Sequence, residues 1–367
     1  KITARKLVNN QNLDLKGGFL TLSDQAGSGL INNALITSAN SDLIISGAMQ
    51  NNAAGILQSQ HNHNIILDSL AGEIINAGQI KTDNELHLSG QILNQNIITR
   101  TDDANPLDAK QRKYLKIVIN DGNLTNDLAG KIITNNYLSI DGNNGLGSLT
   151  NYGLIRSSHL SDVNNFNDDA VINISNVNRL NNSGIIDAAE DLVVSANMIN
   201  NNNSGLLFAG LDVTLNTNSL TNDNAIIISS SGDIKIQKEI ITNSDGSEDY
   251  IKAEQINNIN GGQIKTLKSK VDAPLFDDAD VRKVLANYAT EMLSTNNFSA
   301  EELNRRLYAL RGYLKNSDLS IEEQMNQEVS GNIKIHANVL RNDSRAIISS
   351  NNYIKINADQ IINDHNS

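Results

Sequence analysis

The string His61-Asn62-His63 is the first place where residue types and spacing could support chemistry. Two histidines two residues apart would share one face of a strand and could bind a metal ion there. The string also looks like part of a nuclease signature, but it lacks the flanking metal ligands and the ββα pattern of such a site. We therefore interpret the histidines as a solvent-facing pair, and we predict neither a metal site nor a cofactor.

Two acid pairs, Asp102/Asp103 and Asp168/Asp169, are the other candidates for catalysis. Glycosidic hydrolysis needs two carboxylates about 5–10 Å apart beside a groove. These acids lie in Asn/Asp-rich stretches that are typical of solvated turns, and no supporting residues can be recognised. The sequence also has no cysteine, phosphate-binding glycine loop, nucleophile elbow or metal-ligand spacing. We predict that the chain is not an enzyme and has no catalytic residues.

The composition excludes some classes of partner. The 367 residues carry a formal net charge of −12, which argues against nucleic acid or an anionic membrane surface as a ligand. No apolar run approaches the roughly 18–20 residues of a membrane span. The chain begins at Lys1 without a signal peptide, and neither end resembles a capping unit. We expect it to be a piece of a longer protein.

The elements that would position any site come from a repeat of about 20 residues. Its frame is an apolar pair, an alternating run and an apolar-x-Asn step, and it reads most clearly in Gly184–Asn201 and Gly205–Asn222. Roughly 12 copies can be recognised along the chain. The other clear copies begin at Ile36, Ile80, Ile132, Ile227 and Ile347.

Within each copy the apolar period is two, which indicates half-buried strands. Val194, Leu215, Ile236 and Ile356 hold equivalent positions, and we expect them to point inward. Short strands joined by Asn/Gly/Ser/Asp corners predict an all-β solenoid, a parallel β-helix with one coil per repeat. Asparagines at one corner should stack as a ladder of side-chain amides. The expected members are Asn201, Asn222, Asn243, Asn342 and Asn363.

Three insertions interrupt the repeat, at Arg100–Tyr114, Ser157–Ala170 and Lys270–Val329. Each falls between the first and the second strand of a coil, so all three should leave from the same edge. Insertions on one face of a solenoid often mark its binding face. We therefore expect this edge to contact a partner.

The largest insertion changes to helical spacing in Ala279–Leu293, and a capping box at Ser299 opens a second helix. The predicted domains are β-helix repeats over 1–269, an α-helical insertion over 270–330 and a continuation of the β-helix over 331–367. Tyr and Arg are enriched at interface hot spots. The candidate partner-binding residues are Arg305, Arg306, Tyr308 and Arg311.

The frame of Gly184–Asn201 and Gly205–Asn222 resembles the filamentous-haemagglutinin repeat. That family contains large haemagglutinin/haemolysin-like exoproteins of Gram-negative bacteria, including contact-dependent growth-inhibition effectors. The resemblance implies a right-handed parallel β-helix, exported by two-partner secretion through an outer-membrane transporter. It also implies a rod that holds an adhesive or toxin-delivering region away from the cell. The long helical insertion and the Asn/Ile-rich composition depart from the family.

We therefore expect a structural and binding segment of a secreted exoprotein, or of one displayed on the outer-membrane surface of a Gram-negative bacterium. Its partner would be a cell-surface protein or glycan receptor, contacted through the insertions. The alternative is a carbohydrate-active parallel β-helix, such as a polysaccharide lyase or a tailspike-like hydrolase. Release of reducing ends or unsaturated products from a polysaccharide would distinguish the two.

Overall fold

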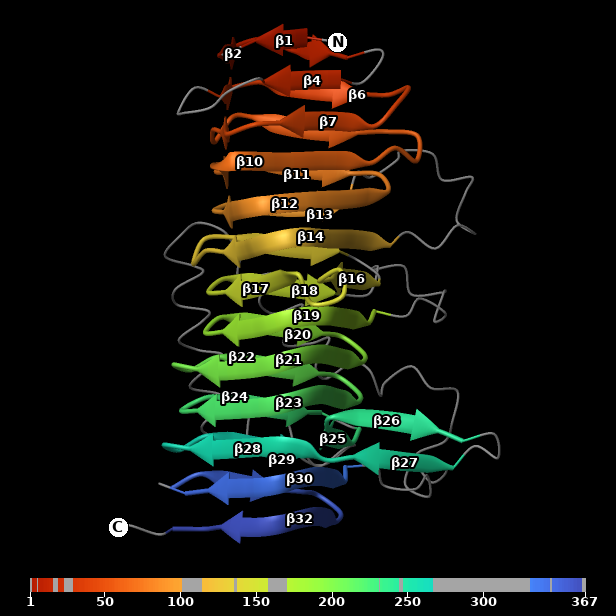
Figure 1. The fold of residues 1–367 in the computed structure, drawn as a ribbon, viewed down its shortest axis with the longest axis vertical. Helices are drawn as coiled ribbons and strands as arrows, with labels where there is room; N and C mark the ends of the chain where they lie inside the picture. Colours follow the sequence, from red (N-terminus) through yellow and green to blue (C-terminus); the bar gives the residue numbers. More distant parts are fainter. Residues whose placement is uncertain are drawn as a thin grey trace, which may run out of the picture. The chain divides into compact units, whose positions relative to one another are not determined.

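The computed structural model describes residues 2–364, except 5, 16–18, 23–28, 101–113, 135–136, 158–169, 231, 244–246, 267–330 and 344. These residues form strands, turns and irregular segments, with no helix among them (Figure 1). They divide into two compact units: unit 1 contains residues 1–187 and 193–200, and unit 2 contains residues 188–192 and 201–367. The predicted all-β class is confirmed for the described part of the chain.

Unit 1 is built from two sheets of parallel strands that alternate along the chain. The first sheet contains β1 (Ile2–Ala4), β2 (Leu7–Asn9), β4 (Phe19–Leu22), β5 (Leu30–Asn32), β7 (Leu43–Ser46), β8 (Met49–Asn51), β10 (Ile65–Asn76), β12 (Glu85–Asn94), β14 (Leu115–Asn126), β16 (Leu138–Asp141), β17 (Gly147–Asn151), β19 (Ile172–Asn182) and most of β21 (Leu192–Asn202). The second sheet contains β3 (Leu13–Asp14), β6 (Leu35–Ser38), β9 (Ile56–Ser59), β11 (Gln79–Thr82), β13 (Ile97–Arg100), β15 (Lys131–Thr134), β18 (Leu154–Ser157) and β20 (Ile185–Ala188). Each repeat thus contributes to both sheets.

Unit 2 repeats this arrangement and adds one element. Its first sheet contains β23 (Val213–Asp223), β25 (Ile234–Gln237), β28 (Ala253–Ile259), β30 (Ile333–Asn342) and β32 (Ile354–Ile362). Its second sheet contains β22 (Leu206–Ala209), β24 (Ile226–Ser229), β29 (Gln263–Thr266) and β31 (Ile347–Ser349). A separate antiparallel pair is formed by β26 (Glu239–Thr242) and β27 (Glu248–Ile251). Stacked parallel strands are typical of a solenoid.

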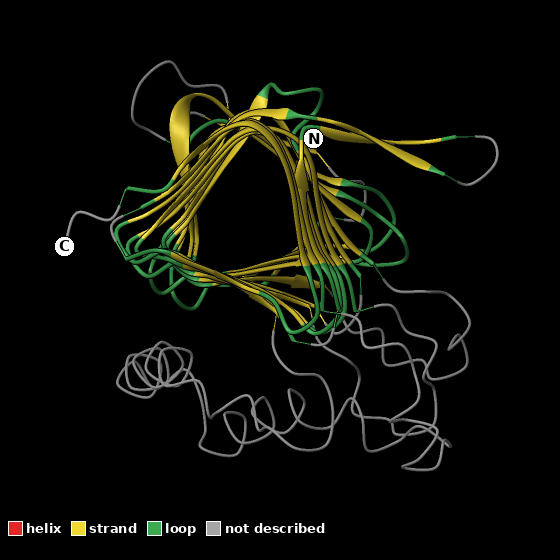
Figure 2. Cartoon of the chain, turned by 90° about the horizontal axis from the view of Figure 1, so that it is seen from below, coloured by secondary structure: helices red, strands yellow, loops and turns green. Residues whose placement is uncertain are grey.

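The apolar core follows from in-register pairing, which places equivalent residues of neighbouring repeats side by side. In unit 1, Ile65 of β10 pairs with Leu86 of β12, and Leu86 pairs with Ile117 of β14. All three side chains are fully buried. Seen end-on, the strands surround this interior (Figure 2). Alternation with period two therefore separates the enclosed side chains from those that face solvent.

A continuous series of buried asparagines occupies one corner of unit 1. Each Nδ2 donates to the Oδ1 of the asparagine in the next repeat, as Asn32 does to Asn51 at 2.8 Å. The series is Asn9, Asn32, Asn51, Asn76, Asn94, Asn126, Asn151 and Asn182. In unit 2 the same bonds join Asn201, Asn222, Asn258 and Asn342. The predicted amide ladder is present in both units.

The ladder also satisfies the main chain at the corner. The Nδ2 of Asn126 donates to the carbonyl oxygen of Leu154 at 3.1 Å as well as to Oδ1 of Asn151 at 2.8 Å. Leu154 begins a strand of the second sheet, so one amide ties the end of one strand to the start of another. A Cβ on Gly130 would lie 2.4 Å from Oδ1 of Asn126. Glycine at this corner therefore leaves space for the ladder.

Two predicted ladder residues, Asn243 and Asn363, are not part of the ladder: Asn363 is exposed, and the Nδ2 of Asn342 donates to the carbonyl oxygen of Ala346 instead. Asn243 follows β26 in the antiparallel pair, and Asn258 of β28 takes its place in the ladder. The Ile241-x-Asn243 step fitted the repeat locally, but the chain leaves the first sheet after β25 and returns at β28. Asn363 lies just after β32. The antiparallel pair is thus an insertion that the repeat pattern did not reveal.

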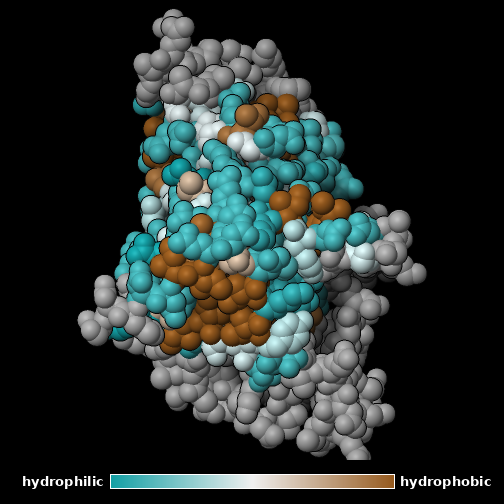
Figure 3. Space-filling view, turned by 60° about the horizontal axis from the view of Figure 1, so that its bottom comes forward, coloured by the Kyte–Doolittle hydropathy of each residue, from teal (hydrophilic) through white to brown (hydrophobic). Residues whose placement is uncertain are grey.

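The inward row is confirmed at three of its four predicted positions. Val194, Leu215 and Ile236 are fully buried, whereas Ile356 is 37% exposed. Ile356 belongs to β32. Among the described strands, β32 pairs with β30 and has no strand on its other side. Interior side chains of this repeat are therefore uncovered on one side, and Figure 3 shows apolar side chains gathered over this part of unit 2. The exposed apolar residues of the last repeat are Ile347, Tyr353, Ile354, Ile356 and Ile361.

The described ends of the three interruptions agree with a common corner. In unit 1 the chain leaves after β13 and after β18, and it returns to β14 and β19. In unit 2 it leaves after β29 and returns to β30. Each interruption thus lies between a strand of the second sheet and a strand of the first. Nearly all of each insertion, including the predicted helices of 270–330, lies outside the described residues.

Replacing Asn32 by alanine should destabilise the protein strongly. The change leaves the buried amides of Asn9 and Asn51 each without one partner, at about 1–3 kcal/mol per unsatisfied group. Asn33→Ala is the matched control, because the bond from Asn33 to Asn10 is exposed and the bond it accepts from Asn52 is only partly buried, so water can replace both. Urea unfolding of both variants measures the difference, and equal losses would contradict a structural role for the ladder.

Candidate ligand-binding site

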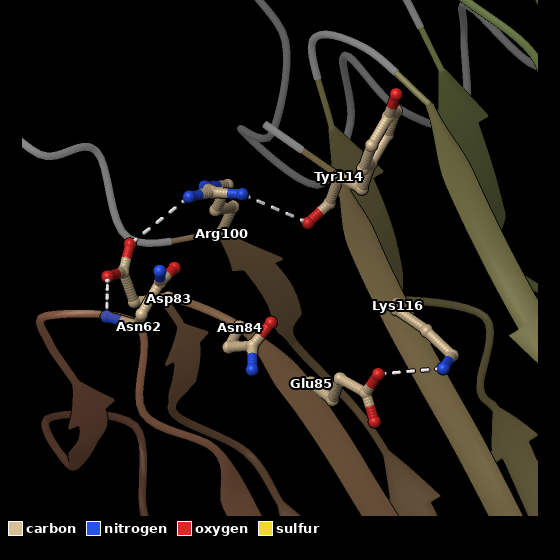
Figure 4. A pocket seen from close by; sticks show the side chains of 7 residues that line it. All are labelled: Asn62, Asp83, Asn84, Glu85, Arg100, Tyr114 and Lys116. Atoms are coloured by element: carbon tan, nitrogen blue, oxygen red, sulfur yellow. Dashed lines mark hydrogen bonds and ion pairs between the residues drawn. The ribbon is translucent and has the colours of Figure 1, made fainter. Parts of the chain in front are cut away.

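A small polar groove lies in unit 1, at the corner where the first interruption leaves and returns. Its volume is 190 Å³. It is lined by Asn62, Asp83, Asn84, Glu85, Arg100, Tyr114 and Lys116 (Figure 4). These residues come from the turns that connect the second sheet to the first and from the adjoining strand ends. Three successive repeats therefore build one site.

Arg100 at the end of β13 organises one side of the groove. Its Nη2 lies 3.3 Å from Oδ1 of Asp83, and its Nη1 donates to the carbonyl oxygen of Tyr114 at 3.1 Å. Asp83 is 3% exposed, and its Oδ2 accepts the main-chain N–H of Asn62 at 2.6 Å. The buried Nε of Arg100 has no hydrogen-bond partner among the described residues. This ion pair ties together the turns of three repeats.

Glu85 and Lys116 form the other side, on adjacent strands of the first sheet. Lys116 Nζ lies 2.7 Å from Oε1 of Glu85, and His87 Nε2 lies 2.9 Å from Oε2. Partial burial alone would raise the pKa of Glu85, but the hydrogen bond and charge of Lys116, helped by His87, outweigh it and lower that pKa. The Glu85 side chain is therefore a carboxylate over the physiological pH range.

Aromatic side chains stand beside these charges. Tyr114 is 39% exposed, and its ring meets the ring of Tyr137 edge-on, with centroids 5.1 Å apart. Tyr137 precedes β16 at the equivalent corner of the next repeat, and its hydroxyl accepts a hydrogen bond from Asn173 at 3.0 Å. Asn84 is exposed at the groove. The corner thus offers an aromatic surface next to amide, carboxylate and cationic groups.

The chemistry of the groove suits a neutral ligand rich in hydroxyl groups. Two carboxylates and two cations are matched in pairs, so the lining presents many donors and acceptors without a net charge. The volume is below the roughly 300–1,000 Å³ of drug-sized pockets, which limits the ligand to a small group such as one sugar ring. A tyrosine ring can cover the apolar face of such a ring.

The histidine pair does not have the predicted geometry. His61 and Asn62 lie in a turn with φ values of 54° and 65°, so the pair does not share the face of a strand. His63 Nδ1 lies 3.6 Å from Oδ1 of Asp42. Within the described residues, no group of three or more His, Cys, Asp or Glu side chains could hold a metal ion.

The remaining predicted site residues lie outside the described residues. These are Asp102, Asp103, Asp168 and Asp169 among the acids, and Arg305, Arg306, Tyr308 and Arg311 among the candidate partner-binding residues. The groove itself was missed because its charged pairs join different copies of the repeat. Its signal is visible when neighbouring copies are aligned: Glu85 and Lys116 both directly precede a buried apolar residue, Leu86 or Ile117, and pair in register.

The corresponding corner of unit 2 carries a row of aspartates. Oδ1 of Asp191 accepts the N–H of Asp212 at 2.9 Å, and Oδ1 of Asp212 accepts the N–H of Asp233 at 2.7 Å. Asp233 in turn accepts the N–H groups of Gly331 and Asn332 at 3.0 and 2.8 Å. The row therefore anchors the chain where it returns from the third interruption.

The charges along this row differ in their consequences. Burial, together with the carboxylates of Asp191 and Asp233, raises the pKa of Asp212. Burial also acts to raise the pKa of Asp233, but hydrogen bonds from Asn332 and Gly331 outweigh it and lower that pKa. At neutral pH the ionised Asp212 thus opposes folding, while the ionised Asp233 supports it.

No family model matches this sequence, and no curated protein or solved structure is significantly similar to it. The described part of the chain contains no helix that is long and apolar enough to cross a membrane. Function must therefore be inferred from the repeat and from the geometry of the corner.

Glu85→Gln should lower the free energy of unfolding at pH 7 by up to about 1 kcal/mol, because it removes a partly exposed ion pair. The folded-state pKa is lowered, so the carboxylate stabilises the protein above its unfolded pKa of about 4.3. This contribution disappears as the pH falls through the folded pKa. The free energy of unfolding, measured from about pH 3 to about pH 7, tests this. Glu73→Gln is the control, because Glu73 of β10 is exposed. A loss that persists undiminished in acid would contradict it.

Asp212→Asn and Asp233→Asn should have opposite effects at pH 7. The raised pKa of Asp212 means that removing its charge stabilises the protein, and this gain should vanish below the unfolded pKa of about 3.9. Asp233→Asn weakens the charge-assisted hydrogen bonds from Gly331 and Asn332, and it should lower the free energy of unfolding by about 1–3 kcal/mol. Thermal unfolding of both variants decides, and a shift in the same direction would rule out this assignment.

Proposed function

We propose that the chain is a non-enzymatic structural and binding segment of a large exoprotein, and that it holds a neutral glycan of a target cell in the corner groove of unit 1. The observation that carries the proposal is the charge-matched, hydroxyl-compatible lining of that groove. In this role the repeats supply length and the corner supplies recognition.

The proposed architecture is a right-handed parallel β-helix of about 20-residue coils with a small α-helical insertion. In-register parallel pairing, the amide ladders and the resemblance to the filamentous-haemagglutinin repeat support it. The family places such segments on secreted or surface-displayed proteins of Gram-negative bacteria, exported through an outer-membrane transporter. We propose the same localisation here, with an adhesive or toxin-delivering role.

The position of the groove supports recognition by an edge. The turns that line it belong to the corner from which both interruptions of unit 1 leave the sheets. Loops positioned by a rigid scaffold commonly carry binding residues. A ligand in the groove would therefore also be within reach of neighbouring corner segments, which suits a cell-surface glycan longer than one sugar.

Binding fits the electrostatics of the groove better than hydrolysis. Cleavage of a glycosidic bond needs a carboxylic acid that stays protonated, hence one with a raised pKa. Glu85 has a lowered pKa, and Asp83 is ion-paired with Arg100. The carbohydrate-active alternative would need its acid from elsewhere in the chain.

A glycan array probed with the full chain tests the proposal. We expect binding to neutral cell-surface glycans, and we expect the double variant Asn84→Ala/Tyr114→Ala to bind about tenfold more weakly or worse. The matched control is Tyr152→Ala, since Tyr152 is 47% exposed but lies outside the groove.

Four outcomes would contradict the proposal in different ways. Binding that survives the double variant would exclude the groove, while a preference for anionic glycans would exclude the charge argument. Release of reducing ends or unsaturated products from a bound polysaccharide would favour the carbohydrate-active alternative. Attachment to whole cells without any glycan signal would point to a protein receptor.

A further inference from the structure

The antiparallel pair of β26 and β27, here called the ribbon, is unlike the rest of unit 2. It leaves the first sheet after β25 and extends away from the stacked strands (Figures 1 and 2). Its strands pair Glu239 with Ile251 and Ile241 with Asp249, and they pair with no other strand in the described part of the chain. Two-stranded ribbons are marginally stable alone in water.

One face of the ribbon is fixed to unit 2. Ile240 and Tyr250 are directly opposite each other and half-buried on this face. The ring of Tyr250 stacks on the imidazole of His336 in β30, with centroids 4.2 Å apart and planes 7° from parallel. His336 is 4% exposed. At the base, Lys252 forms an ion pair with Asp359 of β32. The ribbon is therefore held in place without burying its other face.

The other face carries Glu239, Ile241, Asp249 and Ile251, and all four side chains are exposed. Ile241 is 43% exposed and Ile251 is 38% exposed. Residues opposite each other in an antiparallel pair share a face, so the two isoleucines lie on a diagonal between the two carboxylates. The strand edges on either side of this face belong to a sheet of two strands. An unprotected edge of this kind is a template for another strand.

We propose that the ribbon is a docking arm for an extended segment of a partner protein rich in β-branched and basic residues, which pairs as a third strand. Main-chain hydrogen bonds to the edge would supply affinity, as in other cases of strand addition. An apolar side chain of the partner would cover the isoleucine of the strand that it joins, Ile241 of β26 or Ile251 of β27. A basic side chain of the partner would meet the carboxylate two residues before that isoleucine, Glu239 or Asp249.

The charges select this occupant over a second copy of the chain. Two copies of the ribbon would gather four exposed carboxylates, Glu239 and Asp249 of each copy, in one interface, which is electrostatically unfavourable. The chain as a whole carries a net charge of −12, so a basic segment is also attracted at longer range. The docking arm lies in unit 2 and does not depend on ligand binding in the corner groove.

The test uses the full chain and short synthetic peptides. In each peptide every second residue is threonine, and the residues between are lysine and valine. We expect saturable binding by fluorescence anisotropy, weakened as salt rises from about 0.05 M to about 0.5 M. A peptide with glutamate in place of lysine should not bind. A peptide with proline at alternate positions should also fail, because proline lacks the N–H needed for strand pairing.

Two variants of the ribbon distinguish specific docking from general attraction to an acidic protein. Ile241→Thr/Ile251→Thr keeps the charge and the strand propensity, and it should weaken binding about tenfold. Asp127→Asn/Asp223→Asn removes two charges elsewhere and should have little effect. Undiminished binding to the isoleucine variant, equal binding of the glutamate peptide, or no binding of any peptide would overturn the proposal. Circular dichroism confirms that each variant is folded.

Discussion

The side-chain amide of asparagine, repeated at one corner, is the interaction on which both units depend. Each amide accepts from one neighbouring repeat and donates to the next, and it also satisfies a carbonyl where the chain turns into the second sheet. Buried polar groups are tolerated only when they are paired. A stack of strands bent at corners would otherwise leave main-chain groups without partners. The requirement for glycine at Gly130 follows from the same crowding.

Much of this organisation could be read from the sequence because it is periodic. Alternation with period two predicted the burial of Val194 and Leu215, and the apolar-x-Asn step predicted Asn201 and Asn222 as ladder residues. The error at Asn243 shows the limit of a short pattern. A two-position match cannot tell a sheet corner from a protruding antiparallel pair. The dipeptide Asp245-Gly246, whose residue types favour hairpin turns, was the stronger signal in the sequence.

The groove could not be predicted in the same way, because it is not contained in any one repeat. Arg100 meets Asp83 and Lys116 meets Glu85 only because parallel pairing in register places successive repeats about 4.8 Å apart. A single-copy motif such as His61-Asn62-His63 is conspicuous in the sequence, but His61 and Asn62 lie in a left-handed turn and not on a strand. In a stacked fold, chemistry is assembled across copies, so the useful comparison is between equivalent positions of neighbouring repeats.

The amide ladder also has a direction. Every Nδ2 from Asn9 to Asn151 donates toward the following repeat, so the amide dipoles of unit 1 align head to tail. Aligned dipoles polarise one another, which makes a long run stronger per bond than a short one. The stack of unit 1 is therefore polar: within the run, each repeat offers a polarised N–H to the repeat that follows it in the sequence.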